Sequence, residues 1–189
     1  MSRLLLKGGT TVAPVTWNPS AKGTNITLSG GNLTEAGGVG LVRATASVAP
    51  GTKVYWELLI VSGGDPLIGI DDGSSNVNNY LGATGSFGWG WYFPFSLIFH
   101  NGGTVGTSVG ATVGNVISFA IDHVAHTMTI YKDGVAITPV TTILSATSYY
   151  PCASSASASG KITARFSSAS FSNPLLIWTT LSAAGYTPL

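Results

Sequence analysis

The sequence carries very little charge. Asp, Glu, Lys and Arg make up 8% of its 189 residues, where a soluble domain has about 25%. A disordered chain is excluded, because disorder requires low hydrophobicity and high net charge, whereas this chain is 44% hydrophobic with net charge +1. The basic residues are spread from Arg3 to Arg165 without a cluster. We therefore expect no nucleic-acid partner, since phosphate neutralisation requires grouped Lys and Arg.

Cysteine and long apolar runs are also scarce. Cys152 has no second cysteine to pair with, and we expect a buried, inert thiol. The longest apolar runs, at 58–61 and 93–99, have the length of strands and fall far short of the ~20 residues of a membrane helix. The three leucines at 4–6 are too few for a signal-peptide core. These observations predict neither membrane insertion nor a targeting segment.

Helical periodicity is nearly absent, whereas period-two alternation is common. In 53–61, one face takes Val54, Trp56, Leu58 and Ile60. The segments 115–122 and 126–132 alternate in the same way, with Ile117, Phe119 and Ile121 on one face of the first and Met128 and Ile130 on one face of the second. Such alternation is typical of strands with one buried face.

Turn signals divide the chain into about ten candidate strands. Gly-, Asn- and Asp-rich turns fall at 30–32, 63–66, 72–74, 101–103 and 133–134. This spacing favours an antiparallel sandwich or barrel with one apolar core. The first 15 residues and the last ten are less patterned, and we expect arms that dock on a neighbour.

Several motifs in fixed order resemble the SPRY domain, in particular the version found in bacteriophage proteins. The resemblance covers roughly residues 16–178 and rests on segments that include 16–19, 53–58 (Lys-Val-Tyr-Trp-Glu-Leu), 68–70, 80–82, 88–92, 100–102 and 128–134. It implies an all-β fold, a bent antiparallel β-sandwich of the concanavalin-like jelly-roll kind. An N-terminal arm (1–15) and a C-terminal tail (179–189) would flank this domain.

The resemblance also implies a binding module rather than an enzyme. The match to phage sequences predicts a structural protein of the virion surface, attached to the capsid or tail and held by other virion proteins or by copies of itself. The alternative is a receptor-binding module of the tail that contacts a host cell-surface glycan or protein through loops at 63–80 and 92–112. Both interpretations place the protein in the virion.

Residues with catalytic or metal-binding chemistry are few. His123 and His126 share one expected hairpin turn with Asp122, and we interpret them as a solvated turn, because a metal site there lacks a third ligand. Asp71 and Asp72 are neighbours, so on a strand they point to opposite faces, and Glu57 has a structural place in the Trp-Glu strand. We therefore predict no enzyme, no cofactor and no metal site.

The most polar loop, 71–80, is the first candidate for binding. Its Asp71, Asp72, Asn76 and Asn78 have oxygens suited to calcium, to a sugar or to a peptide, although the same residue types favour turns, which is the interpretation we prefer. The resemblance adds Arg43, Tyr80 and the 154–159 loop, which correspond to elements that line the peptide-binding end of related domains.

Aromatic residues form the second candidate. Alternation predicts Phe87, Trp89 and Trp91 on one face, packed in the core. The segment 92–95 breaks the alternation and contains a proline, so Tyr92, Phe93 and Phe95 are predicted to form an exposed apolar contact surface. His100 and Asn101 in the following turn complete the candidate binding residues.

Overall fold

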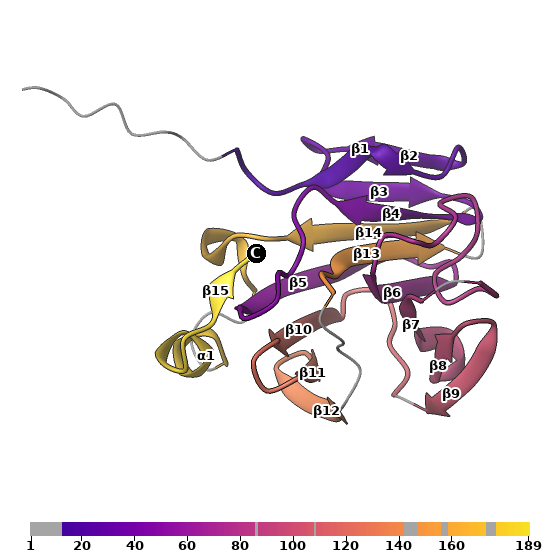
Figure 1. The fold of residues 1–189 in the computed structure, drawn as a ribbon. Helices are drawn as coiled ribbons and strands as arrows, with labels where there is room; N and C mark the ends of the chain where they lie inside the picture. Colours follow the sequence, from indigo (N-terminus) through magenta and orange to yellow (C-terminus); the bar gives the residue numbers. More distant parts are fainter. Residues whose placement is uncertain (1–12, 86, 108, 142–146, 156–158, 173–176) are drawn as a thin grey trace, which may run out of the picture.

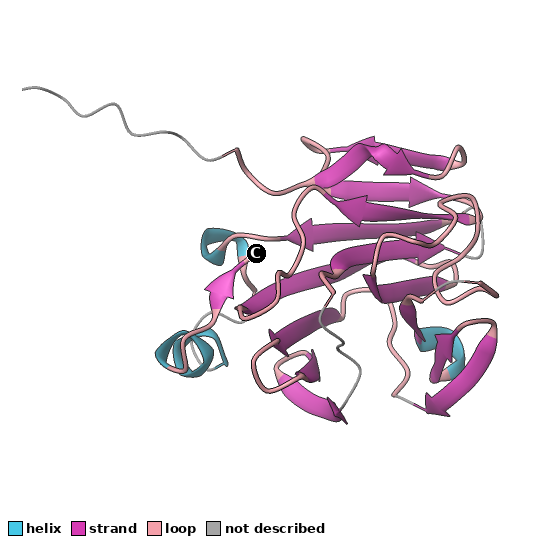
Figure 2. Ribbon diagram, in the orientation of Figure 1, coloured by secondary structure: helices cyan, strands magenta, loops and turns pink. Residues whose placement is uncertain are grey.

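Strands account for most of the regular structure of this protein (Figures 1 and 2). The computed structural model describes residues 13–85, 87–107, 109–141, 147–155, 159–172 and 177–189. Two antiparallel sheets face each other across a shared apolar core. The predicted all-β sandwich is confirmed.

The larger sheet has eight strands. Seven follow one another in hydrogen-bonded order: β12 (Val135–Thr141), β11 (Thr127–Lys132), β10 (Val116–Asp122), β5 (Lys53–Ser62), β14 (Gly160–Arg165), β3 (Thr34–Gly37) and β2 (Ile26–Ser29). The eighth strand, β15 (Thr187–Pro188), pairs in parallel with the start of β5. The long central strand β5 pairs with β10, β14 and β15, and thus joins the middle and C-terminal parts of the chain.

The second sheet has five strands. Their order is β13 (Tyr150–Ser155), β6 (Pro66–Asp71), β7 (Trp89–Tyr92), β8 (Leu97–His100) and β9 (Gly103–Thr107). A two-stranded pair, β1 (Trp17–Lys22) with β4 (Gly40–Ala44), packs alongside β13 through β4. Three short helical elements complete the description: η1 (Phe93–Phe95), η2 (Ser168–Ser170) and α1 (Thr179–Ala183).

The core follows the predicted alternation. Val54, Trp56, Leu58 and Ile60 of β5 all point into it, together with Ile117, Phe119 and Ile121 of β10 and Met128 and Ile130 of β11. The Trp56 and Phe119 rings stack with centroids 5.0 Å apart. Each of these residues is at most 6% exposed, so the prediction of one shared apolar core is confirmed.

The C-terminal segment covers the other face of the larger sheet. Phe171, Leu181 and the partly buried Trp178 pack against Tyr55 and Ala120, and Phe171 meets the Tyr55 ring edge-on at 4.9 Å. The predicted C-terminal tail at 179–189 packs on this chain's own larger sheet, through Leu181 and through the pairing of β15 with β5. In Figure 1, α1 and β15 lie at the end of the sheet where β5 begins. Of the predicted N-terminal arm, residues 1–12 lie outside the described part of the chain.

The turn after β10 differs from the prediction. His123 is 2% exposed, and its Nε2 lies 2.9 Å from the Thr147 carbonyl oxygen. His126 is exposed and has a left-handed backbone, with φ +54°. The prediction of a solvated turn thus holds for His126 and fails for His123, whose ring is held beneath the segment before β13.

Within the described residues, no helix has the length and apolar character needed to span a membrane.

Candidate binding surface

Aromatic residues gather on the outer face of the five-stranded sheet. Tyr92 of β7 pairs with Leu67 of β6, whereas their neighbours Trp91 and Ile68 point into the core. Leu67, Tyr80, Tyr92 and Phe99 line a hollow of about 230 Å³ on this face. The Tyr92 ring lies 5.0 Å from the Phe95 ring and 5.9 Å from the Phe99 ring. We call Tyr80, Tyr92, Phe95 and Phe99 the aromatic surface.

Exposure of the aromatic surface is uneven. Phe95 is 63% exposed and Tyr80 is 38% exposed, while Tyr92 and Phe99 are partly buried. The surface therefore has two accessible rings above two rings that pack against Leu67. Exposed aromatic side chains next to a buried apolar base are typical of protein contact sites.

Glycines let the segment 80–82 lie directly on the sheet. A Cβ atom at Gly90 would come within 2.8 Å of the Leu81 carbonyl oxygen. Gly82 has φ +81°, and a Cβ there would come within 2.9 Å of the Phe99 Cβ. Both positions need glycine for this close approach. Because Leu81 is then fully buried, Tyr80 is placed beside Tyr92 and Phe99.

A buried ion pair anchors the same loop. The Arg43 Nε donates to Asp71 Oδ2 at 2.5 Å, and Arg43 Nη2 donates to the Ser75 carbonyl oxygen at 2.5 Å. Asp71 also accepts hydrogen bonds from the Gly73 backbone N–H, at 3.0 Å, and from the Ser75 hydroxyl. Arg43 is 9% exposed and Asp71 is fully buried. Each charge is engaged inside the protein, where an unpaired charge is costly, and the part of these two residues in binding stays a prediction.

The remaining polar residues of the loop form turns. Asp72 Oδ1 accepts the Ser74 backbone N–H at 2.9 Å, and Asn76 Oδ1 accepts the Asn78 backbone N–H at 3.0 Å. Asn78 Oδ1 accepts the Thr24 backbone N–H at 3.0 Å. The local contacts of Asp72 and Asn76 are the turn pattern that the sequence favoured, whereas Asn78 holds the loop to the distant Thr24. Within the described ranges, no three His, Cys, Asp or Glu side chains are grouped as metal ligands.

The segment 92–95 has two sides. Phe93 is fully buried, so the prediction that it is exposed is wrong. Its ring packs into the core because η1 begins directly after β7 and turns the chain by one 3₁₀ turn, which ends at Ser96 with φ +53°. Phe95 remains outside. The segment therefore forms a ridge, with Tyr92 and Phe95 on the aromatic surface and Phe93 facing inward.

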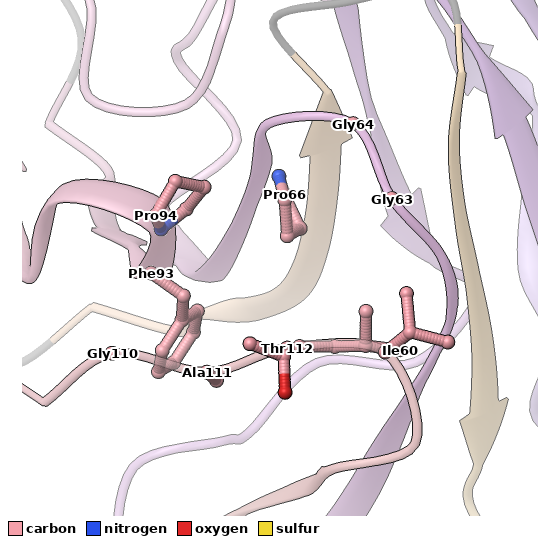
Figure 3. Close-up of a pocket in the computed structure, with 10 residues that line it drawn as sticks. Ile60, Gly63, Gly64, Pro66, Phe93, Pro94, Gly110, Ala111 and Thr112 are labelled. Atoms are coloured by element: carbon pink, nitrogen blue, oxygen red, sulfur yellow. The ribbon is translucent and has the colours of Figure 1, made fainter.

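A second concavity, of about 540 Å³, lies on the other side of this ridge (Figure 3). Figure 3 shows Phe93 and Pro94 beside the Gly110–Thr112 segment, with Pro66 and the Gly63–Gly64 turn across from them. The lining residues are uncharged: Ile60, Gly63, Gly64, Pro66, Phe93, Pro94, Gly110, Ala111, Thr112 and Val113. We call this the glycine–proline groove.

His100 and Asn101 contact the segment 85–89 and do not belong to the aromatic surface. The His100 ring stacks on Trp89 at 4.2 Å with 12° between the planes, and its Nδ1 lies 3.1 Å from the Gly88 carbonyl oxygen. Asn101 Oδ1 accepts the Gly85 backbone N–H at 2.8 Å.

Trp89 is partly buried and Trp91 is fully buried, as predicted. Phe87 precedes β7 and is 58% exposed, so its predicted place in the core is wrong.

Other sequence candidates are buried. Ser154 and Ser155 of the predicted 154–159 loop belong to β13 and are fully buried, while 156–158 lie outside the described residues. Cys152 is buried as expected, and burial, followed by the Asp71 charge, raises the pKa of its thiol. Glu57 accepts hydrogen bonds from the Tyr55 hydroxyl and the Ser172 backbone N–H, which confirms its structural place.

Three residues near this surface were not singled out from the sequence, although they lie within the predicted contact loops 63–80 and 92–112. Leu67 and Phe99 line the hollow, and Asp65 lies close enough to raise the pKa of the Tyr92 hydroxyl through its charge and a hydrogen bond, after the larger effect of burial. Alternation in 97–100 separates Leu97 and Phe99 from Ile98 and His100, so Phe99 could have been assigned to the outer face. Asp65 had no such signal, because its place depends on the β5–β6 turn.

Comparison with solved structures identifies the fold. The chain is similar to the SPRY domain of human HERC1, with a TM-score of 0.64, 20% identity, and coverage of 78% of this chain and 96% of that chain. It is similar to the PSpry domain of TRIM65, with a TM-score of 0.66, 14% identity, and coverage of 80% and 88%. It is also similar to stonustoxin, with a TM-score of 0.65, 17% identity and coverage of 81% of this chain, although the match takes up 27% of stonustoxin.

Sequence comparison alone does not detect a similarity to known families. No protein-family model matches the chain, and neither does any curated protein sequence. The three structural likenesses therefore establish the SPRY-like β-sandwich that the sequence predicted, and the fold by itself does not assign a function.

Proposed function

We propose that this chain is a non-enzymatic binding module on the surface of a bacteriophage virion, attached to the capsid or the tail. The SPRY-like fold supports a binding module. The phage assignment draws on the resemblance of the motif order to phage proteins of this type, and on the low charge of 8%, which suits a protein held by neighbours.

The aromatic surface is the observation that carries this proposal. On the larger sheet, the chain's own C-terminal segment packs against the outer side chains Tyr55 and Ala120. The smaller sheet leaves Tyr80 and Phe95 exposed above Tyr92 and Phe99. An apolar surface of this kind is stabilised when a partner removes it from water. In this proposal the partner is another virion protein or a second copy of the chain.

The proposal includes no catalytic step. Glu57 forms part of an ion pair with Arg165, with 3.5 Å between Oε2 and Nη1, and Asp71 pairs with Arg43. Asp122 pairs with Lys53 at 2.8 Å. These carboxylates hold segments of the fold together, which is a structural role.

The location of the protein tests the proposal. An antibody raised against the purified chain should label intact phage particles in immunogold electron microscopy, with all particles labelled at the same position on the capsid or the tail. Particles purified by density gradient should retain the chain through a high-salt wash, because an apolar contact is not screened by salt. A chain that stays entirely in the unassembled fraction would contradict a virion role.

A second function, adhesion to the host cell, is favoured by the accessible rings of Tyr80 and Phe95. In this alternative the aromatic surface contacts a glycan or protein of the cell surface. Labelled chain should then bind intact host-type cells saturably, and an excess of unlabelled chain should displace it. Virion labelling without cell binding would support the structural role, whereas saturable cell binding would support adhesion.

A further inference from the structure

The hollow within the aromatic surface combines aromatic rings with one nearby carboxylate. Its lining consists of Leu67 and the rings of Tyr80, Tyr92 and Phe99. The pKa of the Tyr92 hydroxyl is raised, first by burial and then by the nearby Asp65 carboxylate. None of the four lining residues carries a positive charge. A carboxylate beside an uncharged aromatic lining favours a cationic ligand over an anionic one.

The rings form inclined walls. The planes of two lining rings, Tyr92 and Phe99, are inclined by 54° with centroids 5.9 Å apart. Inclined rings leave parts of their faces open, whereas parallel stacked rings cover each other's faces. The face of an aromatic ring is the negative end of its quadrupole and attracts a cation placed within about 6 Å of the ring centre.

We propose that the hollow binds a trimethylammonium group, of the kind carried by choline or by a trimethylated lysine side chain. The inference rests on the proposed function, because it names the ligand chemistry of the same aromatic surface. A volume of about 230 Å³ accommodates a small group, and it lies below the roughly 300–1,000 Å³ of sites that enclose drug-sized ligands.

The chemistry of the lining distinguishes this ligand from a sugar. A sugar ring carries several hydroxyl groups, and each needs a hydrogen-bond partner when water is removed. Of the four lining residues, Leu67 and Phe99 have no polar side-chain atom, and the tyrosines supply one hydroxyl each. A trimethylammonium group makes no hydrogen bonds through its methyl groups, so this lining satisfies it fully.

The test is a titration of the full chain, followed by aromatic fluorescence and by calorimetry. The probes are choline, phosphocholine and N-acetyl-trimethyl-lysine amide. The control is 3,3-dimethylbutanol, which has the shape of choline without its charge, and glucose and galactose are included for the sugar class. We expect saturable binding of choline that is at least about tenfold tighter than that of the neutral control. The tighter of phosphocholine and trimethyl-lysine identifies the source of the group.

Substitutions locate the site. Tyr80→Ala should weaken choline binding by about tenfold, whereas Tyr80→Phe, which keeps the ring, should retain it. Asp65→Asn should weaken choline binding and leave the affinity for 3,3-dimethylbutanol unchanged. Phe87→Ala is the control, because Phe87 is also an exposed aromatic residue, at 58% against 38% for Tyr80, and does not line the hollow.

Three results would overturn the inference: no binding of the three ammonium probes, equal affinity for choline and its neutral control, or binding of a hexose without choline. Choline binding that survives Tyr80→Ala would also overturn it. Each of these results leaves the proposed function standing if the chain is still found on the virion, so the two failures are distinguishable.

Discussion

Glu35 places a carboxyl group inside the sandwich without a hydrogen-bond partner among the described residues. It is fully buried on β3, and its cross-strand neighbours are Ile162 and Leu28. Burial raises its pKa from 4.5 to about 8. The fold therefore contains this side chain as a neutral acid at pH 7.

The raised pKa predicts that stability depends on pH. Between pH 4.5 and about 8 the folded protein holds the Glu35 proton and the unfolded chain releases it. Stability from this group is therefore fully present below pH 4.5 and is lost as pH rises toward 8. The expected loss over this window is on the order of 4–5 kcal/mol. Urea unfolding at a series of pH values measures it.

Glu35→Gln is the matched variant, since it has the same shape and no titration. The difference in unfolding free energy between the variant and the wild type should grow in favour of the variant as pH rises from 5 to 8. Stability curves that stay parallel over this range would show that Glu35 titrates normally.

Arg43 gives a second prediction at the scale of the residue. Arg43→Met should lower the free energy of unfolding by about 3–5 kcal/mol, because it leaves the Asp71 carboxylate buried without its cation. Lys53→Met is the control, since the Lys53 side chain is 33% exposed in its pair with Asp122, and such pairs contribute about 0–1 kcal/mol. Equal losses for the two variants, measured by chemical denaturation, would contradict the structural place assigned to Arg43.

Individual residues were the part of the site hardest to predict from sequence. Arg43, Asp71 and Phe93 have the polar or aromatic chemistry of a binding site, but burial decides their role, and burial depends on contacts between segments far apart in the chain. Arg43 meets Asp71 across 28 positions. Tyr80 and Phe95 have the exposure that the sequence interpretation required, and their part in binding stays a prediction.

At the scale of the element, the aromatic surface depends on how the segment 80–82 lies on β7 and β8. Gly90→Ala would place a methyl group 2.8 Å from the Leu81 carbonyl oxygen. The backbone must then shift, and we expect a loss of about 1–3 kcal/mol in stability together with displacement of Tyr80. Thermal unfolding and the accessibility of Tyr80 to iodination measure the two effects.

Gly103→Ala is the control for this prediction, because the nearest atom to its added methyl group is the His100 carbonyl oxygen at 3.8 Å. It lies on β9 of the same sheet. If Gly90→Ala were as stable as Gly103→Ala, the close approach of the segment 80–82 would be wrong.

The strands were predictable because their signal is local. Alternation in β5, β10 and β11 depends on neighbouring residues and assigned the core face correctly. The C-terminal segment carries no comparable pattern, since α1 has five residues and β15 has two. The C-terminal segment takes its position by packing on the apolar outer face of β5. The sequence places Tyr55 on that face, but it gives no signal that Phe171 and Leu181 pack against it.

At the scale of the whole molecule, the two outer sheet faces differ. The chain's own C-terminal segment packs on the outer face of the larger sheet at Tyr55 and Ala120, and the smaller sheet carries the aromatic surface. The order of motifs along 16–178 was sufficient to predict the SPRY-like sandwich, because many weak signals agreed. The partner could not be predicted in the same way, since it depends on a few exposed side chains.

Site-specific photo-crosslinking tests the central claim, that the aromatic surface is the contact surface, most directly. A benzophenone amino acid is placed at Phe95 of the aromatic surface, which is 63% exposed, or at Phe87, which is 58% exposed and is not part of that surface. Illumination of assembled particles should crosslink the chain to a virion protein from position 95 and not from position 87. Crosslinking from position 87 alone, or from neither position in particles that contain the chain, would contradict the account.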